Sequence, residues 1–260
     1  MENRYDSLVS KMVDDGQLPK FVYRMVKINQ HLYDGINNSE IWFSNPTDFN
    51  DPFDCDININ MKGTNQKEIQ EYFQKYLSKS ITNREKHLVQ NLNQITILEF
   101  ENLINIVSKR IINRKGVACF LSSKRNLLMW SHYADSHKGV CLKFSIKEDL
   151  DFFSPAKKVN YENDYPKYNY LQQRNDFVKY MFFTKSKDWE YEGEVRVFKN
   201  KSGNYKFKKE ALKELIFGCR TSPKDIKTIT ILIKNLYPNA SLKIAKKKKS
   251  SFGLDFETIN

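Results

Sequence analysis

Long hydrophobic runs are missing from this sequence. Its longest apolar stretch is only a few residues, whereas a membrane-spanning helix needs about 20. Residues 1–6 also lack the apolar core of a signal peptide. We therefore expect a cytoplasmic protein without a membrane partner.

Closely spaced cysteines are missing too. Cys55, Cys119, Cys141 and Cys219 lie far apart, and no histidine stands at zinc-ligand spacing from them. This pattern argues against a bound metal at the cysteines and predicts buried, reduced thiols. There is also no internal repeat, low-complexity linker or proline-rich hinge. The sequence therefore favours one domain, residues 1–260.

Acidic residues are outnumbered by basic ones. The 43 Lys and Arg against 31 Asp and Glu give a net charge of +12, which favours a polyanionic partner such as RNA or DNA. Four consecutive lysines, Lys246 to Lys249, follow an apolar strand pattern. This run is interpreted either as a hairpin turn that contacts phosphate or as a solvated loop.

What is present is a mixture of strand and helix patterns without regular alternation, which predicts the α+β class. Apolar residues at helical spacing predict a helical insertion at about 64–113, with one helix over 66–77 and two packed helices between 85 and 112. An earlier helix, over 28–35, is expected to end at Gly35 as its C-cap. Further helices are predicted over 126–134, 168–183 and 223–236.

Two carboxylates, Glu192 and Glu194, occupy alternate positions of a predicted strand over 189–197. Alternate residues of a strand face one side of the sheet. Like charges held together in a half-buried strand repel each other, so stability alone gives little reason for the pair. The pair predicts a site that needs negative charge. The alternative is a solvated sheet face on which Arg196 neutralises both.

Two other predicted strands carry residues of catalytic type. Residues 21–26 include Tyr23 and Arg24, and residues 117–123 end in Ser122 and Ser123. An arginine offers a planar fork of donors that suits a phosphate or a carboxylate. Taken with the glutamate strand, these signals indicate a composite site.

A loop with several acids follows the predicted strand over 41–44. Its Asp48, Asp51, Asp54 and Asp56 suggest a metal site, but the glycine and distal glutamate of a calcium loop are absent. We interpret these acids as turn caps in an ordered loop. No metal is predicted.

Three motifs together resemble a widespread bacterial family of unknown function. They are Asn50–Asp54 (NDPFD), Met129–Tyr133 (MWSHY) followed by His137–Gly139, and Trp189–Arg196 (WEYEGEVR). This resemblance covers most of the chain and implies no activity.

In order and setting, Arg24, Ser122 and Glu194 also resemble the Arg, Ser and Glu triad of the ADP-ribosyltransferases related to cholera and pertussis toxins. That resemblance implies a split β-sheet core with NAD as substrate. It further implies that Glu194 stabilises the positive charge that develops on the ribose, that Arg24 clamps a phosphate or ribose and that Ser122 supports Glu194. Glu192 would orient or deprotonate the acceptor.

Some assignments within this resemblance stay open. Tyr23, Trp130 and Tyr133 would line the nicotinamide pocket, although core packing at helical spacing is the alternative for Trp130 and Tyr133. His132 and His137 are either catalytic or solvated and capping. The triad serine departs from the family pattern, and these candidates are open for its role: Ser122, Ser123 and Ser44. No glycine-rich nucleotide loop is present.

These observations lead to one functional hypothesis and two rivals. The hypothesis is an NAD-dependent ADP-ribosyltransferase that modifies a macromolecule, with nucleic acid, RNA above all, favoured over protein as acceptor. It would act as the effector of a bacterial antiphage or toxin-antitoxin system, with an antitoxin protein as a further partner. The first rival is a metal-dependent nuclease that uses the glutamates and the loop aspartates, and the second is a non-catalytic nucleic-acid-binding or sensor module.

Overall fold

The computed structural model describes residues 4–56, 59, 61–79, 81–91, 93–165, 168–173 and 176–259. The chain forms two compact units, each with strands and helices, and the α+β class is confirmed. The first unit comprises Met1–Ser44, Gly116–Val159 and Glu190–Asn260, and the second comprises Asn45–Lys115 and Asn160–Trp189. The second unit contains the predicted helical insertion and also includes residues on both sides of it.

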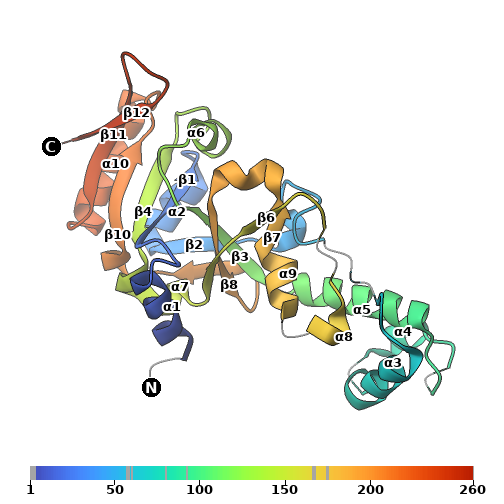
Figure 1. Cartoon of the computed structure of the whole chain (residues 1–260). Helices are drawn as coiled ribbons and strands as arrows, with labels where there is room; N and C mark the ends of the chain where they lie inside the picture. Colours follow the sequence, from blue (N-terminus) through green and yellow to red (C-terminus); the bar gives the residue numbers. More distant parts are fainter. Residues whose placement is uncertain are drawn as a thin grey trace. The chain divides into compact units, whose positions relative to one another are not determined.

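The first unit is built on an eight-stranded sheet (Figure 1) with the order β12-β11-β10-β4-β1-β3-β8-β5. Neighbouring strands are antiparallel except for β10 and β11, which are parallel. The strands are β1 (Phe21–Val26), β3 (Gly116–Leu121), β4 (Val140–Ser145), β5 (Ala156–Lys158), β8 (Glu194–Lys199), β10 (Leu212–Phe217), β11 (Ser241–Lys247) and β12 (Leu254–Thr258). A separate antiparallel pair consists of β2 (Glu40–Phe43) and β9 (Gly203–Lys206).

The two faces of this sheet are both covered. Val22 and Phe120 belong to the larger core, which also takes in side chains of helices, and we call this side the core face. Met25 and Leu121 belong to a second cluster with Trp130 of helix α6, and we call this side the α6 face. Since Val22 and Met25 have opposite parity in β1, the two clusters mark the two sides of the pleat.

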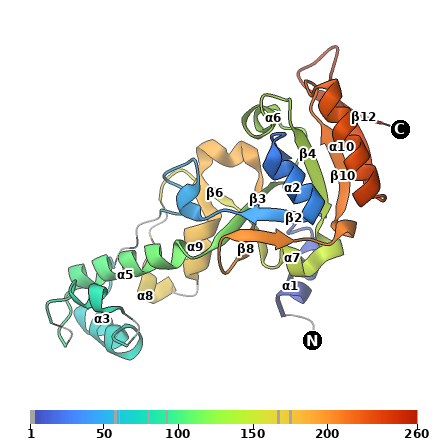
Figure 2. The same cartoon turned by 180° about the vertical axis from the view of Figure 1, so that it is seen from behind.

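Helices cover the core face of the first unit (Figure 2). Those that contribute buried residues to it are α1 (Arg4–Asp14), α2 (Gln30–Asn38), α7 (Leu150–Phe153) and α10 (Pro223–Leu236). The predicted helix over 223–236 is confirmed, with Ser222 accepting the Asp225 N–H as its N-cap and Pro223 at the first helical position. None of the helices in the described part of the chain has the length and apolar character needed to cross a bilayer.

The second unit is mainly helical. Its elements are the 3₁₀-helix η1 (Pro46–Asp48), α3 (Gln66–Tyr72), the π-helix η2 (Phe73–Leu77), α4 (Asn83–Lys86), α5 (Ile97–Ile112), β6 (Asn160–Glu162), α8 (Tyr170–Gln173), α9 (Phe177–Phe183) and β7 (Thr184–Ser186). Ile69, Phe73 and Phe100 are fully buried and hold α3, η2 and α5 together. The helical pattern predicted over 66–77 is thus confirmed.

Two helix predictions are wrong in detail. Helix α2 does not end at Gly35 but continues to Asn38, and Ser39 takes the left-handed C-cap with φ of 55°. Gly35 is required for another reason, because a Cβ there would lie 2.9 Å from the Glu40 carbonyl oxygen. The first helix expected between 85 and 112 is only the single turn α4, and the chain from 87 to 96 is turns and loop, apart from residue 92, which is outside the described residues.

A cluster of lysines around one carboxylate gives a stability prediction. Glu214 of β10 is contacted by the Nζ atoms of Lys143 at 2.7 Å, Lys124 at 3.0 Å and Lys243 at 3.2 Å. Burial alone would raise the pKa of Glu214, but the hydrogen bonds and charges of Lys143 and Lys124 lower it to about 2. Because the folded-state pKa is depressed, the stabilisation is complete above the unfolded pKa of about 4.5 and is lost as the pH falls towards 2.

We expect Glu214→Gln to lower the free energy of unfolding by about 2 to 3 kcal/mol at pH 7, and by progressively less below pH 4. Urea unfolding of the wild-type chain and the variant, at pH 7 and again below pH 4, measures this difference. Glu257→Gln is the matched control, because Glu257 pairs with Lys246 in solvent and should cost less than about 0.5 kcal/mol. An equal cost for the two variants would contradict a special role for the lysine cluster.

Candidate functional site

The three strands that carry the predicted triad lie side by side in the sheet, in the order β1, β3, β8. Tyr23 is opposite Leu121, and Leu121 is opposite Glu194, so these residues form one row across the strands. No strand order was predicted from the sequence, so this adjacency is a finding of the structure. It brings the backbones of the Arg24 and Glu194 strands within one strand of each other.

The pleat, however, sends the side chains of Arg24 and Glu194 to opposite faces. Tyr23 shares the row of Glu194, on the α6 face, so Arg24 is on the core face, as are Val22 and Val26 of the same strand. The structure thus brings the predicted strands together without pairing the two side chains directly.

Glu192 is not on a strand, which corrects the prediction that both glutamates share one strand face. The 3₁₀-helix η5 (Lys187–Glu192) ends at Glu192, and β8 begins only at Glu194. Between them Gly193 has φ of 54°, a left-handed conformation that breaks the strand. Its carbonyl accepts the Ser122 N–H at 2.9 Å, and a Cβ at Gly193 would lie 2.5 Å from Ser122 Oγ. This close contact between Gly193 and Ser122 is where β3 and η5 meet.

Glu194 is held by Arg196 in a buried, two-pronged ion pair. Arg196 Nε donates to Oε1 at 2.9 Å and Nη2 donates to Oε2 at 3.0 Å. Glu194 is 3% exposed and Arg196 is 0% exposed. The sequence had offered the alternative that Arg196 neutralises the glutamates on a solvated sheet face. Arg196 does neutralise Glu194, but this ion pair lies inside the protein. A fork of this kind fixes both carboxylate oxygens.

Glu192 accepts a hydrogen bond from the Tyr133 hydroxyl at 2.9 Å. Burial, and then the charge of Glu192, strongly raise the pKa of Tyr133, with a smaller effect of Glu194. The phenol therefore keeps its proton at neutral pH. Tyr133 ends α6 (Leu127–Tyr133), a helix that begins after Asn126, whose side chain accepts the Leu128 N–H. The N-cap and the helix thus position the Tyr133 hydroxyl for its hydrogen bond to Glu192.

Among the described residues, Arg24 contacts two backbone carbonyls and an aromatic ring. Its Nη1 donates to the Cys119 carbonyl and its Nη2 to the Trp42 carbonyl, each at the long distance of 3.4 Å, and the guanidinium lies 5.8 Å from the Phe120 ring centre. No carboxylate in the described part of the chain forms an ion pair with it. Burial lowers the pKa of Arg24, yet an arginine stays charged. It is a half-buried cation without an anionic partner.

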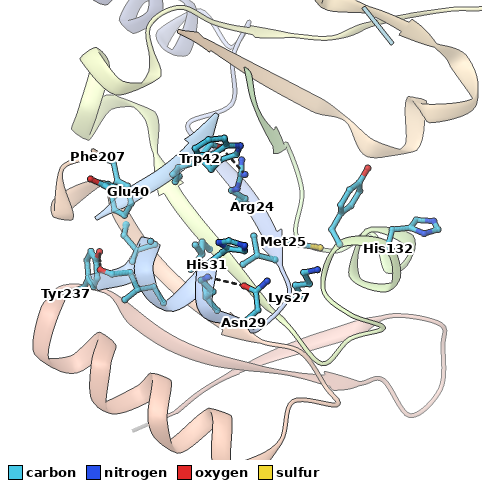
Figure 3. A pocket seen from close by; sticks show the side chains of 18 residues that line it. Arg24, Met25, Lys27, Asn29, His31, Glu40, Trp42, His132, Phe207 and Tyr237 are labelled. Carbon is cyan, nitrogen blue, oxygen red and sulfur yellow. Dashed lines mark hydrogen bonds between the residues drawn. The ribbon is translucent and has the colours of Figure 1, made fainter. Parts of the chain in front are cut away.

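Arg24 lies on the wall of a cleft of about 390 Å³ (Figure 3). Trp42 is beside it and is 52% exposed. The cleft is also lined by polar and basic side chains from the segment between β1 and α2, the first turn of α2 and the end of α6, namely Lys27, Asn29, His31, His132 and Tyr133. It is therefore lined by a cation, by an exposed aromatic ring and by a tyrosine whose hydroxyl is bonded to Glu192.

The remaining predicted residues are scattered around this cleft. Trp130 is fully buried, donates from Nε1 to the Lys124 carbonyl at 2.8 Å and packs with Met25 and Met129, which is the core packing weighed as its alternative. As placed, it offers no surface to a ligand. Tyr23 is half-buried on the α6 face, and its pKa is raised by burial and by Glu214.

The serine candidates also differ in placement. Ser122 is exposed at the end of β3, Ser123 Oγ accepts the Arg125 N–H, and Ser44 bridges to Val117 through its backbone. His132 is exposed on the cleft, whereas the ring of His137 stacks at 6.2 Å from Trp130. The cleft residues that the sequence failed to identify include Trp42 and His31. Only the register of β2 and the position of α2, which are long-range features, place them beside Arg24.

The alternatives built on metals receive no positive support. Within the described ranges, no group of three or more His, Cys, Asp or Glu side chains is arranged to hold a metal ion. Asp51 accepts the Phe53 N–H and so caps a turn, as the sequence predicted for these acids. The four cysteines are free. Cys55 and Cys141 are buried as expected, but Cys119 and Cys219 are partly exposed, which corrects the prediction for those two.

Comparison with known proteins found a match to a family whose function is unknown. No curated protein and no solved structure matches the chain. The match to a family model begins at Met129, in α6, and ends at Val197, in β8, so it includes Tyr133, Glu192 and Glu194 but not Arg24. Over residues 129–197 the chain matches the family described as "Protein of unknown function (DUF2971)". This match confirms the predicted resemblance to a family of unknown function for that segment, whereas the prediction had extended it over most of the chain, including the motif Asn50–Asp54.

Proposed function

We propose that this chain is an NAD-dependent ADP-ribosyltransferase whose substrate cleft is the one lined by Arg24, Trp42 and Tyr133. The observation that carries the proposal is Arg24, a half-buried guanidinium at a cleft with no carboxylate partner among the described residues. A desolvated cation is costly unless a ligand supplies the countercharge. The pyrophosphate of NAD offers oxygens that suit its fork of donors.

The other side chains at the cleft suit the rest of the substrate. The exposed ring of Trp42, beside Arg24, provides a surface on which a base or the nicotinamide can stack. Tyr133 lines the cleft, and its hydroxyl donates to Glu192, which makes the hydroxyl oxygen electron-rich. An electron-rich oxygen favours the positive charge that develops on the ribose when the bond to nicotinamide breaks.

The reaction transfers one group. The bond between the ribose C1′ and the nicotinamide nitrogen breaks, and its electron pair leaves with nicotinamide. The acceptor nucleophile then forms a bond to C1′ and loses a proton. Tyr133 relays that proton, passing its own to Glu192 while it takes the acceptor's. In this scheme Glu192 acts through Tyr133, and Glu194, fixed by Arg196, is a positioning residue for the segment that holds Glu192.

The wider setting is part of the proposal. The net charge of +12 favours RNA, and then DNA, over protein as acceptor. We further propose that the enzyme acts in the cytoplasm as the effector of an antiphage or toxin-antitoxin system and that an antitoxin protein restrains it.

The proposal is tested with purified protein and NAD labelled in its adenylate half, incubated separately with RNA, DNA and a cell protein extract. Nicotinamide release and label transfer are measured. We expect transfer by the wild-type chain, a loss of about 100-fold in kcat/KM for Arg24→Gln, and a smaller loss for Arg24→Lys, which keeps the charge without the fork.

The exposed Lys227 of α10 provides the control variant, Lys227→Gln, which should be unchanged. Circular dichroism and urea unfolding establish that each variant is folded. Absence of both nicotinamide release and transfer in the folded wild-type protein would reject the proposal. Cleavage of RNA or DNA that needs no NAD and is abolished by EDTA would replace it with the nuclease function.

A further inference from the structure

The hairpin that joins β11 to β12 carries an unbalanced positive charge. Lys247, Lys248 and Lys249 occupy its start, and the Lys248 N–H closes the turn on the Gly253 carbonyl at 3.0 Å. Lys248 lies 4.0 Å from Asp255, a marginal ion pair. Lys247 and Lys249 have no ion-pair partner in the described part of the chain. The sequence left open whether this run is a hairpin turn or a solvated loop, and the structure places it at a hairpin.

The pleat of the hairpin separates its acids from Lys247. Lys246 is opposite Asp255 and pairs with Glu257, so these three residues share one face. Lys247 is opposite Leu254, which belongs to the buried cluster of the α6 face. The ion pairs of the strands therefore neutralise Lys246 on one side and leave Lys247 uncompensated on the other.

Lys247 to Lys249 line a second cleft, of about 670 Å³, together with Arg220 and His137. Arg220 is exposed, and its Nη1 donates to the Ser136 carbonyl at 3.4 Å. Burial and the nearby charges of Arg220 and Lys247 lower the pKa of His137, and its buried Nδ1 has no hydrogen-bond partner in the described residues. The described residues that line this cleft include no acid.

The tip of the same hairpin presents an aromatic ring to solvent. Phe252 is 103% exposed, so its side chain has no contact that hides it from water. An isolated exposed Phe in a turn gains nothing from the fold. Beside unpaired lysines, an aromatic platform is the arrangement with which proteins bind single-stranded nucleic acid, since bases stack on the ring while cations contact phosphates.

We infer that the β11–β12 hairpin and the Arg220 cleft form a binding surface for single-stranded nucleic acid. Lys247, Lys249 and Arg220 contact successive phosphates, and Phe252 stacks on a base. Duplex is disfavoured because its bases are already stacked. The inference deepens the proposed function by giving the acceptor a docking surface, but it concerns binding alone and stands whether or not NAD is cleaved.

The test uses the full-length chain, without NAD, and fluorescein-labelled 20-nucleotide poly(U) and poly(dT), followed by fluorescence anisotropy from 50 to 300 mM salt. The wild-type chain should bind both. Lys247→Ala/Lys249→Ala should weaken binding about tenfold or more and reduce the slope of log K against log[salt] by about 1.4, or 0.7 per lost phosphate contact. Phe252→Ala should weaken binding fivefold or more without changing that slope.

Lys246→Ala is the matched control, because it removes the same charge from the same run, on the face where Glu257 already neutralises it. It should leave affinity and slope unchanged. The relative affinities for poly(U) and poly(dT) show whether RNA or DNA is the preferred ligand.

Three outcomes would overturn the inference. The first is that the wild-type chain does not bind the single strands at 50 mM salt. The second is that Lys246→Ala weakens binding as much as the double variant does. The third is that a 20-base-pair duplex binds as tightly as the single strands and Phe252→Ala does not change the affinity. Tight binding of polyglutamate would assign the surface to acidic protein instead. Because none of these binding experiments contains NAD, a negative result would reject the nucleic-acid surface without rejecting the transferase proposal.

Discussion

Replacing Arg196 with methionine is expected to lower the free energy of unfolding by about 3 to 5 kcal/mol. Arg196 is fully buried and binds both carboxylate oxygens of Glu194, which is itself 3% exposed. Methionine fills much of the volume but supplies no charge, so Glu194 would remain buried without the two hydrogen bonds that Arg196 donates. A buried carboxylate without a countercharge is strongly destabilising or becomes protonated. Urea unfolding at pH 7 measures the loss.

A double variant distinguishes this cause from lost packing. If the cost of Arg196→Met comes from the stranded charge, Glu194→Leu/Arg196→Met should be more stable than Arg196→Met alone, since both ionic groups are then gone. Arg196→Lys should be intermediate, because lysine keeps a charge but cannot form the fork. A loss below about 1 kcal/mol in Arg196→Met would mean that the pair contributes little to the fold.

The same pair changes how a glutamate variant must be interpreted. Glu194→Gln would remove the Glu194 charge that Arg196 binds through two hydrogen bonds, so a loss of transferase activity would also follow from a local structural change. Glu192→Gln is the sharper test, because Glu192 is bonded to the cleft residue Tyr133. Tyr133→Phe removes the relay hydroxyl and keeps the ring. A loss in both variants, without a loss of stability, would support the proposed role of the Tyr133–Glu192 pair.

The sequence predicted β1, β2, β3 and the helix over 223–236 well, because their apolar spacing and caps are local signals. It also contained the start of α5, since Thr96 and Glu99 form a capping box, a Thr-x-x-Glu pattern that marks a helix N-terminus. Leu88 belongs to an apolar stripe but is 40% exposed in the structure. An apolar stripe forms a helix only where a partner surface covers it, so the helical prediction around Leu88 was wrong.

The site was less predictable, for two physical reasons. The alternation that put Glu192 and Glu194 on one face requires a continuous strand, and the left-handed Gly193 interrupts it. The face on which Arg24 emerges depends on the register between β1 and β3, which joins residues about 100 positions apart. Residue types indicated which strands matter, whereas long-range pairing decides which side chains meet.

Gly139→Ala is expected to destabilise the protein by about 3 kcal/mol, because the turn before β4 has no space for a methyl group. A Cβ at Gly139 would lie 2.2 Å from the Val26 carbonyl oxygen and 2.9 Å from Ala134 Cα, both of them backbone atoms that cannot rotate away. The Gly139 N–H also bonds the Ala134 carbonyl at 2.7 Å. The substitution must therefore push the turn away from β1.

The conformation of this turn makes such a shift costly. Its residues Asp135, Ser136 and His137 all have left-handed φ, from 46° to 69°, a strained conformation for side chains other than glycine. The Gly218 N–H bonds the Gly139 carbonyl, and a Cβ at Gly218 would lie 2.1 Å from the His137 carbonyl oxygen. Gly218→Ala should therefore cost about as much as Gly139→Ala.

Gly253→Ala is the control for both variants, because a Cβ there would meet only the flexible Lys248 side chain, at 3.3 Å. It should change the free energy of unfolding by less than about 1 kcal/mol. Urea and thermal unfolding of the three variants measure the differences. If Gly139→Ala were as stable as Gly253→Ala, the turn would have to relax readily. In that case His137, which this turn carries to the edge of the Arg220 cleft, would not be held in place by the backbone.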